Sequence, residues 1–221
     1  MFFHIIKSTL LLKQHKGDIM SWIKTIPFEQ ATGKLKMLYE RATGPDNNVD
    51  NIMMSHSLRP HTMEGHMAMY KYVLHHSGNT IPKWFLEVLG VWVSQLNGCD
   101  YCVNHHFSGM KRLLGDDLRA DAILVAIKAL DIGAAPLDAA QHQAMRYAQK
   151  LSQDVANMAE LDVQALRDVG YSDGEVLENN QVSAYFGYAN RTVLGLGCST
   201  TGDVIGLSPN NSADPDDWNH A

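Results

Sequence analysis

The sequence predicts an all-α fold, and two observations lead to that prediction. Apolar residues recur at intervals of three and four residues along most of the chain, which is the spacing of one helix face. No sustained alternation of apolar and polar residues between hairpin turns is present, so β-strands are not expected. Gly, Pro and Asn separate the helical stretches and predict where helices begin and end.

Four helices are expected in the first half of the chain. Pro27 precedes the first, Pro60 begins the second, and Pro82 stands in the first turn of the third, where proline is tolerated. Asn97-Gly98 separates the third helix from the fourth. The stretch 44–57 is rich in Asn and Asp and is predicted to be mostly loop. The expected helices are 28–42, 60–76, 80–96 and 99–114.

Four more helices are expected in the second half. Acidic residues at two of their starts suit the positive end of a helix: Asp116 and Asp117 begin one, and Asp173 and Glu175 lie in the first turn of the last. Pro136 begins another. The expected ranges are 116–130, 136–152, 161–169 and 172–196.

The length of 221 residues is enough for one domain or two small fused ones. Apolar residues make up 45% and charged residues 19% of the chain, an ordinary balance for a globular protein. We expect one helical domain over 20–197, because Met20 begins a sequence of ordinary globular character. Residues 1–19 are interpreted as an N-terminal extension outside the fold, and 198–221 as a polar C-terminal tail that is frayed.

The charge and the cysteine content exclude several classes of protein. The net charge is −6 and the largest basic cluster is Lys111-Arg112, so nucleic-acid binding is not expected. The longest apolar stretch, 122–130, is far shorter than the ~20 residues of a membrane span, and no small-residue cleavage site predicts a secretory signal. Three cysteines are too few for a secreted disulfide framework, so we expect a reducing, cytoplasmic location.

Reactive side chains gather at one helix start. Cys99, Cys102 and His106 follow one another at steps of three and four, which places them on one stripe of a helix. Cysteines three residues apart in a helix have α-carbons about 5 Å apart, which is within the range for a disulfide. The positive helix start favours the thiolate, and His106, one turn beyond Cys102, is placed to accept or relay the thiol proton. The pattern predicts redox chemistry.

Glu87 is a fourth candidate, as the one acid in the apolar stretch 84–96. If this helix and the next form an antiparallel hairpin about Asn97-Gly98, Glu87 lies about 15 Å and His106 about 12 Å from the turn, so the two are nearly level. Gly90 and Ser94 share the face of Glu87 and would let the two helices approach closely. A buried carboxylate there would orient the imidazole and share its proton.

Each of these features has a simpler interpretation. Glu87 pairs with Lys83 on the surface, the two cysteines are inert core residues, or the cysteines bind zinc with His105 or His106 and a further ligand. His105 points away from His106 and is expected to be solvated. The remaining histidines weighed here are interpreted as surface or capping residues: His56, His61, His66, His75 and His76. The methionines are interpreted as core filler or a subunit contact, and Cys198 as unrelated to the pair.

Glu87, eleven intervening residues and then Cys99-x-x-Cys102-x-x-x-His106 resemble the signature of the alkylhydroperoxidase D-like proteins. These belong to the carboxymuconolactone decarboxylase superfamily, and the match is close to its peroxidase-related branch. The resemblance covers roughly residues 22–197, and weaker matches accompany it at 58–60, 163–173, 188–191 and 196–197. The extension 1–19 and the polar tail depart from the pattern without touching the motif.

The resemblance implies an all-α fold with a helical hairpin that carries the cysteines, assembled into homo-oligomers. It also implies an oxidoreductase, a thiol peroxidase that needs no cofactor, haem or metal. Cys102 would be the peroxidatic thiol, Cys99 the resolving thiol, and His106 with Glu87 the proton relay. Metabolic decarboxylases of the superfamily generally lack the cysteine pair, so its presence argues against decarboxylation.

Three functions therefore compete at this point. The first is peroxidase activity towards a hydroperoxide, with an external dithiol or thiol protein as the reductant. The second is a thiol–disulfide relay of low peroxide specificity, and the third is a metal-stabilised or structural oligomer. A homo-oligomer is expected independently, because helices 62–76 and 82–96 carry large apolar residues around much of their circumference.

Overall fold

The computed structural model describes residues 20–44, 47–210, 213–214 and 217–218. Within these residues the regular structure is helical and no β-strand is present, so the predicted all-α fold is confirmed. The helices are α1 Gly33–Ala42, α2 Asn51–Met54, α3 Pro60–Tyr70, α4 Lys83–Leu96, α5 Asp100–Leu114, α6 Asp117–Lys128, α7 Ala139–Gln153, α8 Glu160–Asp168 and α9 Asp173–Leu196. A π-helical turn, Lys71–His75, continues α3, and 3-10 turns lie at Phe28–Gln30, Ile132–Ala134 and Val155–Asn157. The interpretation of residues 1–19 falls outside the described residues.

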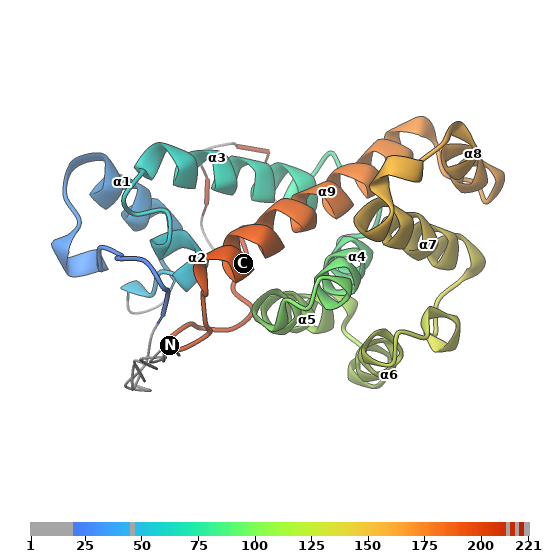
Figure 1. The fold of residues 1–221 in the computed structure, drawn as a ribbon, viewed down its shortest axis with the longest axis horizontal. Helices are drawn as coiled ribbons and strands as arrows, with labels where there is room; N and C mark the ends of the chain where they lie inside the picture. Colours follow the sequence, from blue (N-terminus) through green and yellow to red (C-terminus); the bar gives the residue numbers. More distant parts are fainter. Residues whose placement is uncertain (1–19, 45–46, 211–212, 215–216, 219–221) are drawn as a thin grey trace, which may run out of the picture.

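Helix α4 is the centre of the molecule. Every residue from Phe85 to Ser94 is buried, and α4 packs against α5, α6, α7 and α9 (Figure 1). Its apolar side chains therefore find partners all round within the chain. The argument that a second subunit must cover 82–96 is wrong, because four helices of the same chain enclose it.

Helix α9 crosses α4 at close range. A Cβ atom at Gly90 would lie 2.2 Å from the ring of Phe186 on α9, so only glycine fits there. One turn further along α4, Ser94 Oγ accepts a hydrogen bond from Asn190 Nδ2 at 3.0 Å. Gly90 and Ser94 therefore allow α9 to pack closely against α4. The expectation that they bring α4 and α5 together is wrong. In that hairpin the small residue is Gly109 on α5, whose Cβ would lie 3.4 Å from Glu87 Oε1.

The hairpin itself forms as the sequence predicts. Helix α4 ends at Leu96, Gly98 adopts a left-handed φ of +69°, and Cys99 is the N-cap of α5. The backbone N–H of Cys99 donates to the carbonyl of Ser94 at 2.9 Å, which ties the start of α5 to the end of α4. The turn therefore sets the cysteines beside the last turns of α4.

Most helix ends lie within a few residues of the expected positions. The helix expected from 136 begins at Ala139, because Asp138 and Gln141 form a capping box. Among its described residues the stretch 44–57 is mostly loop, as expected, and contains the four-residue helix α2. Met53 of α2 is buried in a second apolar cluster with α1 and α3, and this burial stabilises the short helix.

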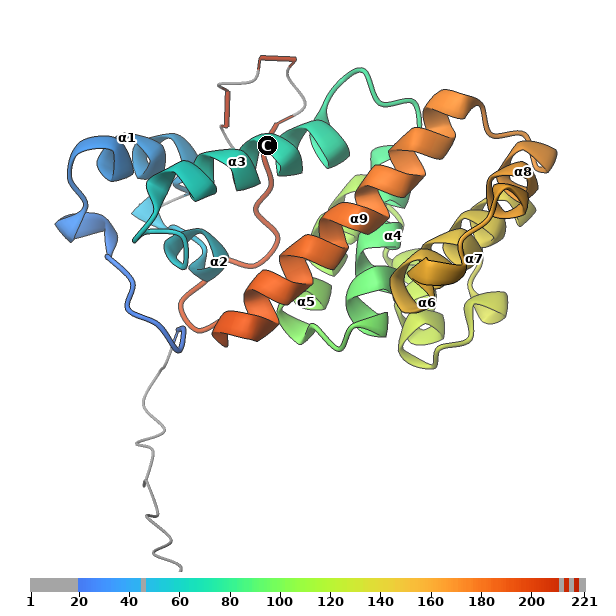
Figure 2. The same ribbon diagram turned by 45° about the horizontal axis from the view of Figure 1, so that its top comes forward.

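The chain after α9 turns back and runs past α2 and α5 (Figure 2). Cys198, Ser208 and Trp218 are buried, and the guanidinium of Arg41 lies over the Trp218 ring at 4.1 Å. The expectation of a frayed tail is therefore wrong for 198–210 and 217–218, because Trp218 completes the cluster of α1 and α3.

Candidate active site

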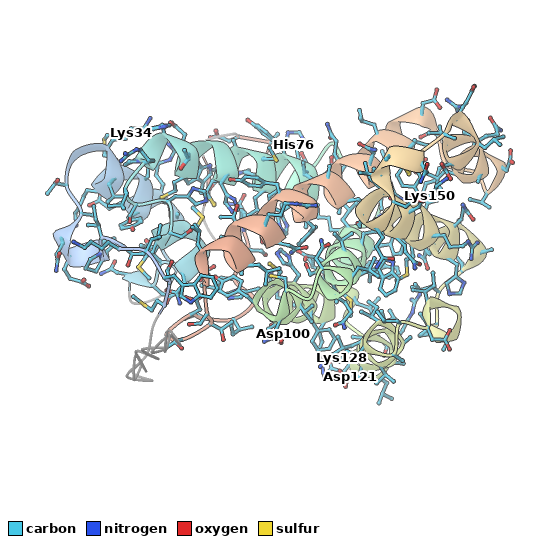
Figure 3. All side chains as sticks on the ribbon, viewed as in Figure 1. Lys34, His76, Asp100, Asp121, Lys128 and Lys150 are labelled. Carbon is cyan, nitrogen blue, oxygen red and sulfur yellow. The ribbon has the colours of Figure 1, made fainter. Side chains whose placement is uncertain are left out.

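The two cysteines of the motif lie at the start of α5. Cys99 caps the helix and Cys102 is in its first turn. The exposed Asp100, labelled in Figure 3, marks the start of this helix. Both are free thiols, and their sulfur atoms lie 2.8 Å apart, close enough to share one proton. Cys99 is 0% exposed and Cys102 is 3% exposed. The site is a buried dithiol.

The two thiols differ in acidity. The pKa of Cys99 lies below its usual value, because of the hydrogen bond between its sulfur and that of Cys102 and a further hydrogen bond with the Cys102 backbone, against the opposing effect of burial. The pKa of Cys102 lies well above its usual value, because its proton is held by Cys99 and because it is buried. A thiolate is thus favoured at Cys99, chiefly through the neighbouring Cys102 thiol, whereas the sequence argument placed the reactive thiolate at Cys102.

Two further polar residues reach the sulfur atoms, and sequence reasoning missed both. Hydrogen bonds from Asn190 act to lower the pKa of each cysteine, and Ser94 does the same for Cys102. Asn97 fixes Asn190, because its Nδ2 donates to Asn190 Oδ1 at 2.8 Å. Asn190 is 1% exposed. Its signal was present, since Asn190 lies in the matched stretch 188–191 and is a polar residue on a buried helix face.

Glu87 and His106 meet as predicted. His106 Nδ1 lies 2.7 Å from Glu87 Oε2, across the α4–α5 hairpin. Glu87 is 1% exposed, so the interpretation of a surface pair with Lys83 is wrong. The physical reason is that Glu87 lies on the side of α4 that faces α5, where Gly109 leaves room for the carboxylate.

His75 faces the other oxygen of Glu87. Its Nε2 lies 3.5 Å from Glu87 Oε1, and the side chain is 4% exposed. Burial lowers the pKa of His75 to about 4, although Glu87 acts in the opposite direction, so His75 is neutral at pH 7. The expectation of a surface residue is wrong, because the π-helical turn 71–75 packs against α4 and α9.

Two more histidines are buried against expectation, while His61 is exposed as expected. His66 is 3% exposed, and burial lowers its pKa to about 3. His105, expected to be solvated, is 8% exposed, stacks on Tyr101 and lies 3.3 Å from Asp203 Oδ2. The returning tail covers this face of α5. Among the described residues, no group of three or more His, Cys, Asp or Glu side chains is placed to hold a metal ion.

A cavity of about 50 Å³ joins the dithiol to the Glu87–His106 pair. Cys102 lines it and Cys99 does not, so Cys102 is the thiol that meets a molecule in the cavity. Glu87, Cys102 and His106 share this lining, and much of the remaining wall is apolar or aromatic. That wall includes Ile52, Met53, Met67, Tyr70, Tyr185 and Leu207.

This geometry can be compared with that of known proteins. No family model and no curated protein matches the sequence. Solved structures do match: the fold is that of the alkylhydroperoxidase AhpD core. An uncharacterized peroxidase-related protein from Ralstonia eutropha JMP134, described as an AhpD core, superposes with a TM-score of 0.71 at 21% identity, over 86% of this chain and 100% of that one.

A second similar structure is an uncharacterized peroxidase-related protein from Silicibacter sp. TM1040. It gives a TM-score of 0.70 at 22% identity, over 84% of this chain and 94% of its own. The predicted AhpD-like helical fold, with a hairpin carrying Cys-x-x-Cys, is therefore confirmed. In the described residues no helix is both long and apolar enough to cross a membrane.

Proposed function

We propose that the protein is a thiol peroxidase that reduces hydroperoxides through a dithiol–disulfide cycle of Cys99 and Cys102, with Glu87 and His106 as the proton relay. One observation carries the proposal: Cys102 of a buried dithiol lines the same small cavity as the buried Glu87 carboxylate and its half-buried partner His106. The peroxidase-related names of the structural neighbours agree with it.

The first step is a proton transfer within the dithiol. Cys99 is the more acidic thiol, whereas Cys102 is the one that meets the cavity. A proton therefore moves from Cys102 to the Cys99 thiolate over the 2.8 Å that separates the sulfur atoms. The resulting Cys102 thiolate is stabilised by hydrogen bonds from Asn190 and Ser94. Cys99 thus acts as the local base before it acts as the resolving thiol.

The Cys102 thiolate then attacks the terminal oxygen of the hydroperoxide. The O–O bond breaks, Cys102 becomes a sulfenic acid, and the alkoxide takes a proton from His106 to leave as an alcohol. Glu87 accepts the Nδ1–H of His106 at 2.7 Å, which stabilises the protonated ring and leaves Nε2 to face the substrate.

Cys99 closes the cycle. Its sulfur attacks the sulfenic sulfur of Cys102, the S–O bond breaks, and water leaves with the Cys99 proton. An external dithiol reduces the disulfide, so each turn converts one hydroperoxide and one dithiol into an alcohol, water and a disulfide. The short distance between the sulfur atoms limits over-oxidation of Cys102.

The test is peroxide consumption with several dithiol donors, run on the wild type, Cys102→Ser and Cys99→Ser. Cys102→Ser should abolish turnover, and Cys99→Ser should accumulate the Cys102 sulfenic acid, which a dimedone adduct reveals by mass. If the wild type exchanges disulfides with a model protein but consumes no peroxide, the relay function is correct and the peroxidase proposal fails.

A further inference from the structure

A segment of the C-terminal tail forms one wall of the cavity. We define residues 203–209 as the C-terminal strap. Gly206, Leu207, Ser208 and Pro209 line the cavity together with Cys102, although about a hundred residues separate them in the sequence. Figure 2 shows the chain after α9 returning past α2 and α5 to this position.

The strap is fastened to α5 at two points. At its start, Asp203 accepts a hydrogen bond from Tyr101 Oη at 2.7 Å and one from the backbone N–H of Asn51 at 3.0 Å. At its end, Arg112 donates to the carbonyl of Gly206 at 2.7 Å and to Ser208 Oγ at 2.5 Å. The strap is therefore held at its start through its own Asp203 carboxylate and near its end through the Arg112 guanidinium.

The strap lies directly on α5 between these points. Gly206 has a φ of +88°, and a Cβ atom there would lie 2.3 Å from Ser108 Oγ. A side chain at this position would both strain the backbone and push the strap away from α5. Leu207 follows and also lines the cavity.

The volume of the cavity beside the strap bears on the size of a molecule that can reach Cys102. With the strap in place the cavity measures about 50 Å³. A cavity that binds benzene measures about 150 Å³. The cavity at Cys102 has about a third of that volume, which favours small hydroperoxides over aryl ones.

We propose that the C-terminal strap sets the size of reagent that reaches Cys102, so that the substrates are hydrogen peroxide and short-chain alkyl hydroperoxides, and bulky aryl hydroperoxides are excluded. The substrate class rests on the proposed peroxidase function. The size limit itself rests on the strap, Leu207 and the cavity, and it applies to any reagent that attacks the thiol.

Two variants and one control test the proposal. Leu207→Ala shortens the side chain in the wall, and Gly206→Val displaces the strap from α5. Ile205→Ala is the matched control, because Ile205 belongs to the strap but is 39% exposed and does not line the cavity. Melting curves establish that each variant is folded.

The first measurement needs no peroxidase activity. The rate of Cys102 alkylation is compared for iodoacetamide and for the bulkier N-phenylmaleimide. In the wild type the small reagent should be strongly preferred, and both variants should raise the relative rate of the bulky one by about tenfold or more, while Ile205→Ala keeps the wild-type ratio. Equal access of both reagents in the wild type, or an unchanged ratio in both variants, overturns the proposal.

The second measurement compares kcat/KM for hydrogen peroxide and cumene hydroperoxide. The same two variants should shift the ratio towards cumene hydroperoxide. If alkylation shows the size limit but no variant consumes any peroxide, the size limit stands and the peroxidase function fails. If the wild type consumes cumene hydroperoxide as readily as hydrogen peroxide, the substrate class is wrong.

Discussion

Glu87 links two histidines at the centre of the site. One of its oxygens lies 2.7 Å from His106 Nδ1, and the other lies 3.5 Å from His75 Nε2. The carboxylate is 1% exposed, so its charge acts on both rings with little screening by water. Substitution by Gln changes one heavy atom of this side chain, so it removes the charge and keeps the packing.

Glu87→Gln keeps the size of the side chain and removes the charge. We expect peroxide reduction to fall by about 10²–10⁴-fold, which is typical when general acid–base assistance is lost. The pKa of Cys102 should rise further, because Glu87 no longer holds the His106 ring that lines the same cavity as the thiol. The measurements are kcat/KM for peroxide and the pH dependence of Cys102 alkylation, with a melting curve as the control. Identical alkylation profiles would show that Glu87 plays no part in activating the thiol.

Buried neutral histidines predict acid sensitivity. Burial lowers the pKa of His75 to about 4 and that of His66 to about 3, from 6.5. Below pH 6.5 these two histidines become protonated in the unfolded chain but stay neutral in the folded protein. The free energy of unfolding therefore falls as the pH falls from 6.5 towards 4. Each pH unit costs up to about 1.4 kcal/mol per histidine.

The test of this prediction is the free energy of unfolding between pH 7 and pH 4.5 for the wild type and His75→Gln. The variant should show a shallower loss of stability, because one of the two histidines no longer contributes. His61→Gln is the control, since His61 is exposed. An equal slope in the wild type and His75→Gln would contradict the burial argument.

At the scale of elements, α4 and α9 cross at close range beside the site. Gly90→Ala would place a Cβ 2.2 Å from Phe186, so α9 must shift. We expect a loss of about 1–3 kcal/mol in the free energy of unfolding. Gly65→Ala on α3 is the matched control, because nothing lies within 4 Å of its Cβ. It should gain about 0.5–1 kcal/mol from helix propensity. Equal melting temperatures for the two variants would show that α9 has room to move.

The hairpin predicts an intrachain disulfide. Cys99 and Cys102 lie at the start of one helix with sulfur atoms 2.8 Å apart, whereas Cys198 is only 9% exposed. Mild peroxide should remove two hydrogens from the peptide that contains Cys99 and Cys102, as peptide mass analysis measures. Dimers linked through Cys198, with the pair still reduced, would be the opposite result and would exclude the proposed cycle.

At the scale of the whole molecule, apolar residues remain exposed on the outer face of α6. Leu118 is 85% exposed and Val125 is 68% exposed, and they lie two turns apart on the helix that also carries Asp121 and Lys128 (Figure 3). The sequence argument for an oligomer relied partly on α4, which the chain itself covers. The exposed apolar residues on the outer face of α6 support the expectation of an oligomer in place of α4.

A symmetric homo-oligomer stays our prediction for the molecule in solution. Light scattering at micromolar concentration should give a mass well above the 24.6 kDa of one chain. Leu118→Asp should lower that mass if the outer face of α6 is the contact, because a charge would be buried there. A wild-type mass near 24.6 kDa would refute the prediction.

The sequence by itself determined the helices, the hairpin and the Glu87–His106 pair. These depend on local spacing: steps of three and four set a helix face, and counting residues from Asn97-Gly98 set the level of two side chains on adjacent helices. The same local rule predicted that a thiolate is favoured at the start of α5.

The tertiary structure alone decided which residues from distant parts of the chain contact the α4–α5 hairpin. Asn190 arrives from α9, His75 from the π-helical turn after α3, and Asp203 and Leu207 from the returning tail. Local spacing does not reveal which partner these residues meet, because a polar residue on a helix or in a tail has the same spacing whether it faces water or a buried thiol. Packing of distant segments, driven by burial of residues such as Trp218, brings them to the site.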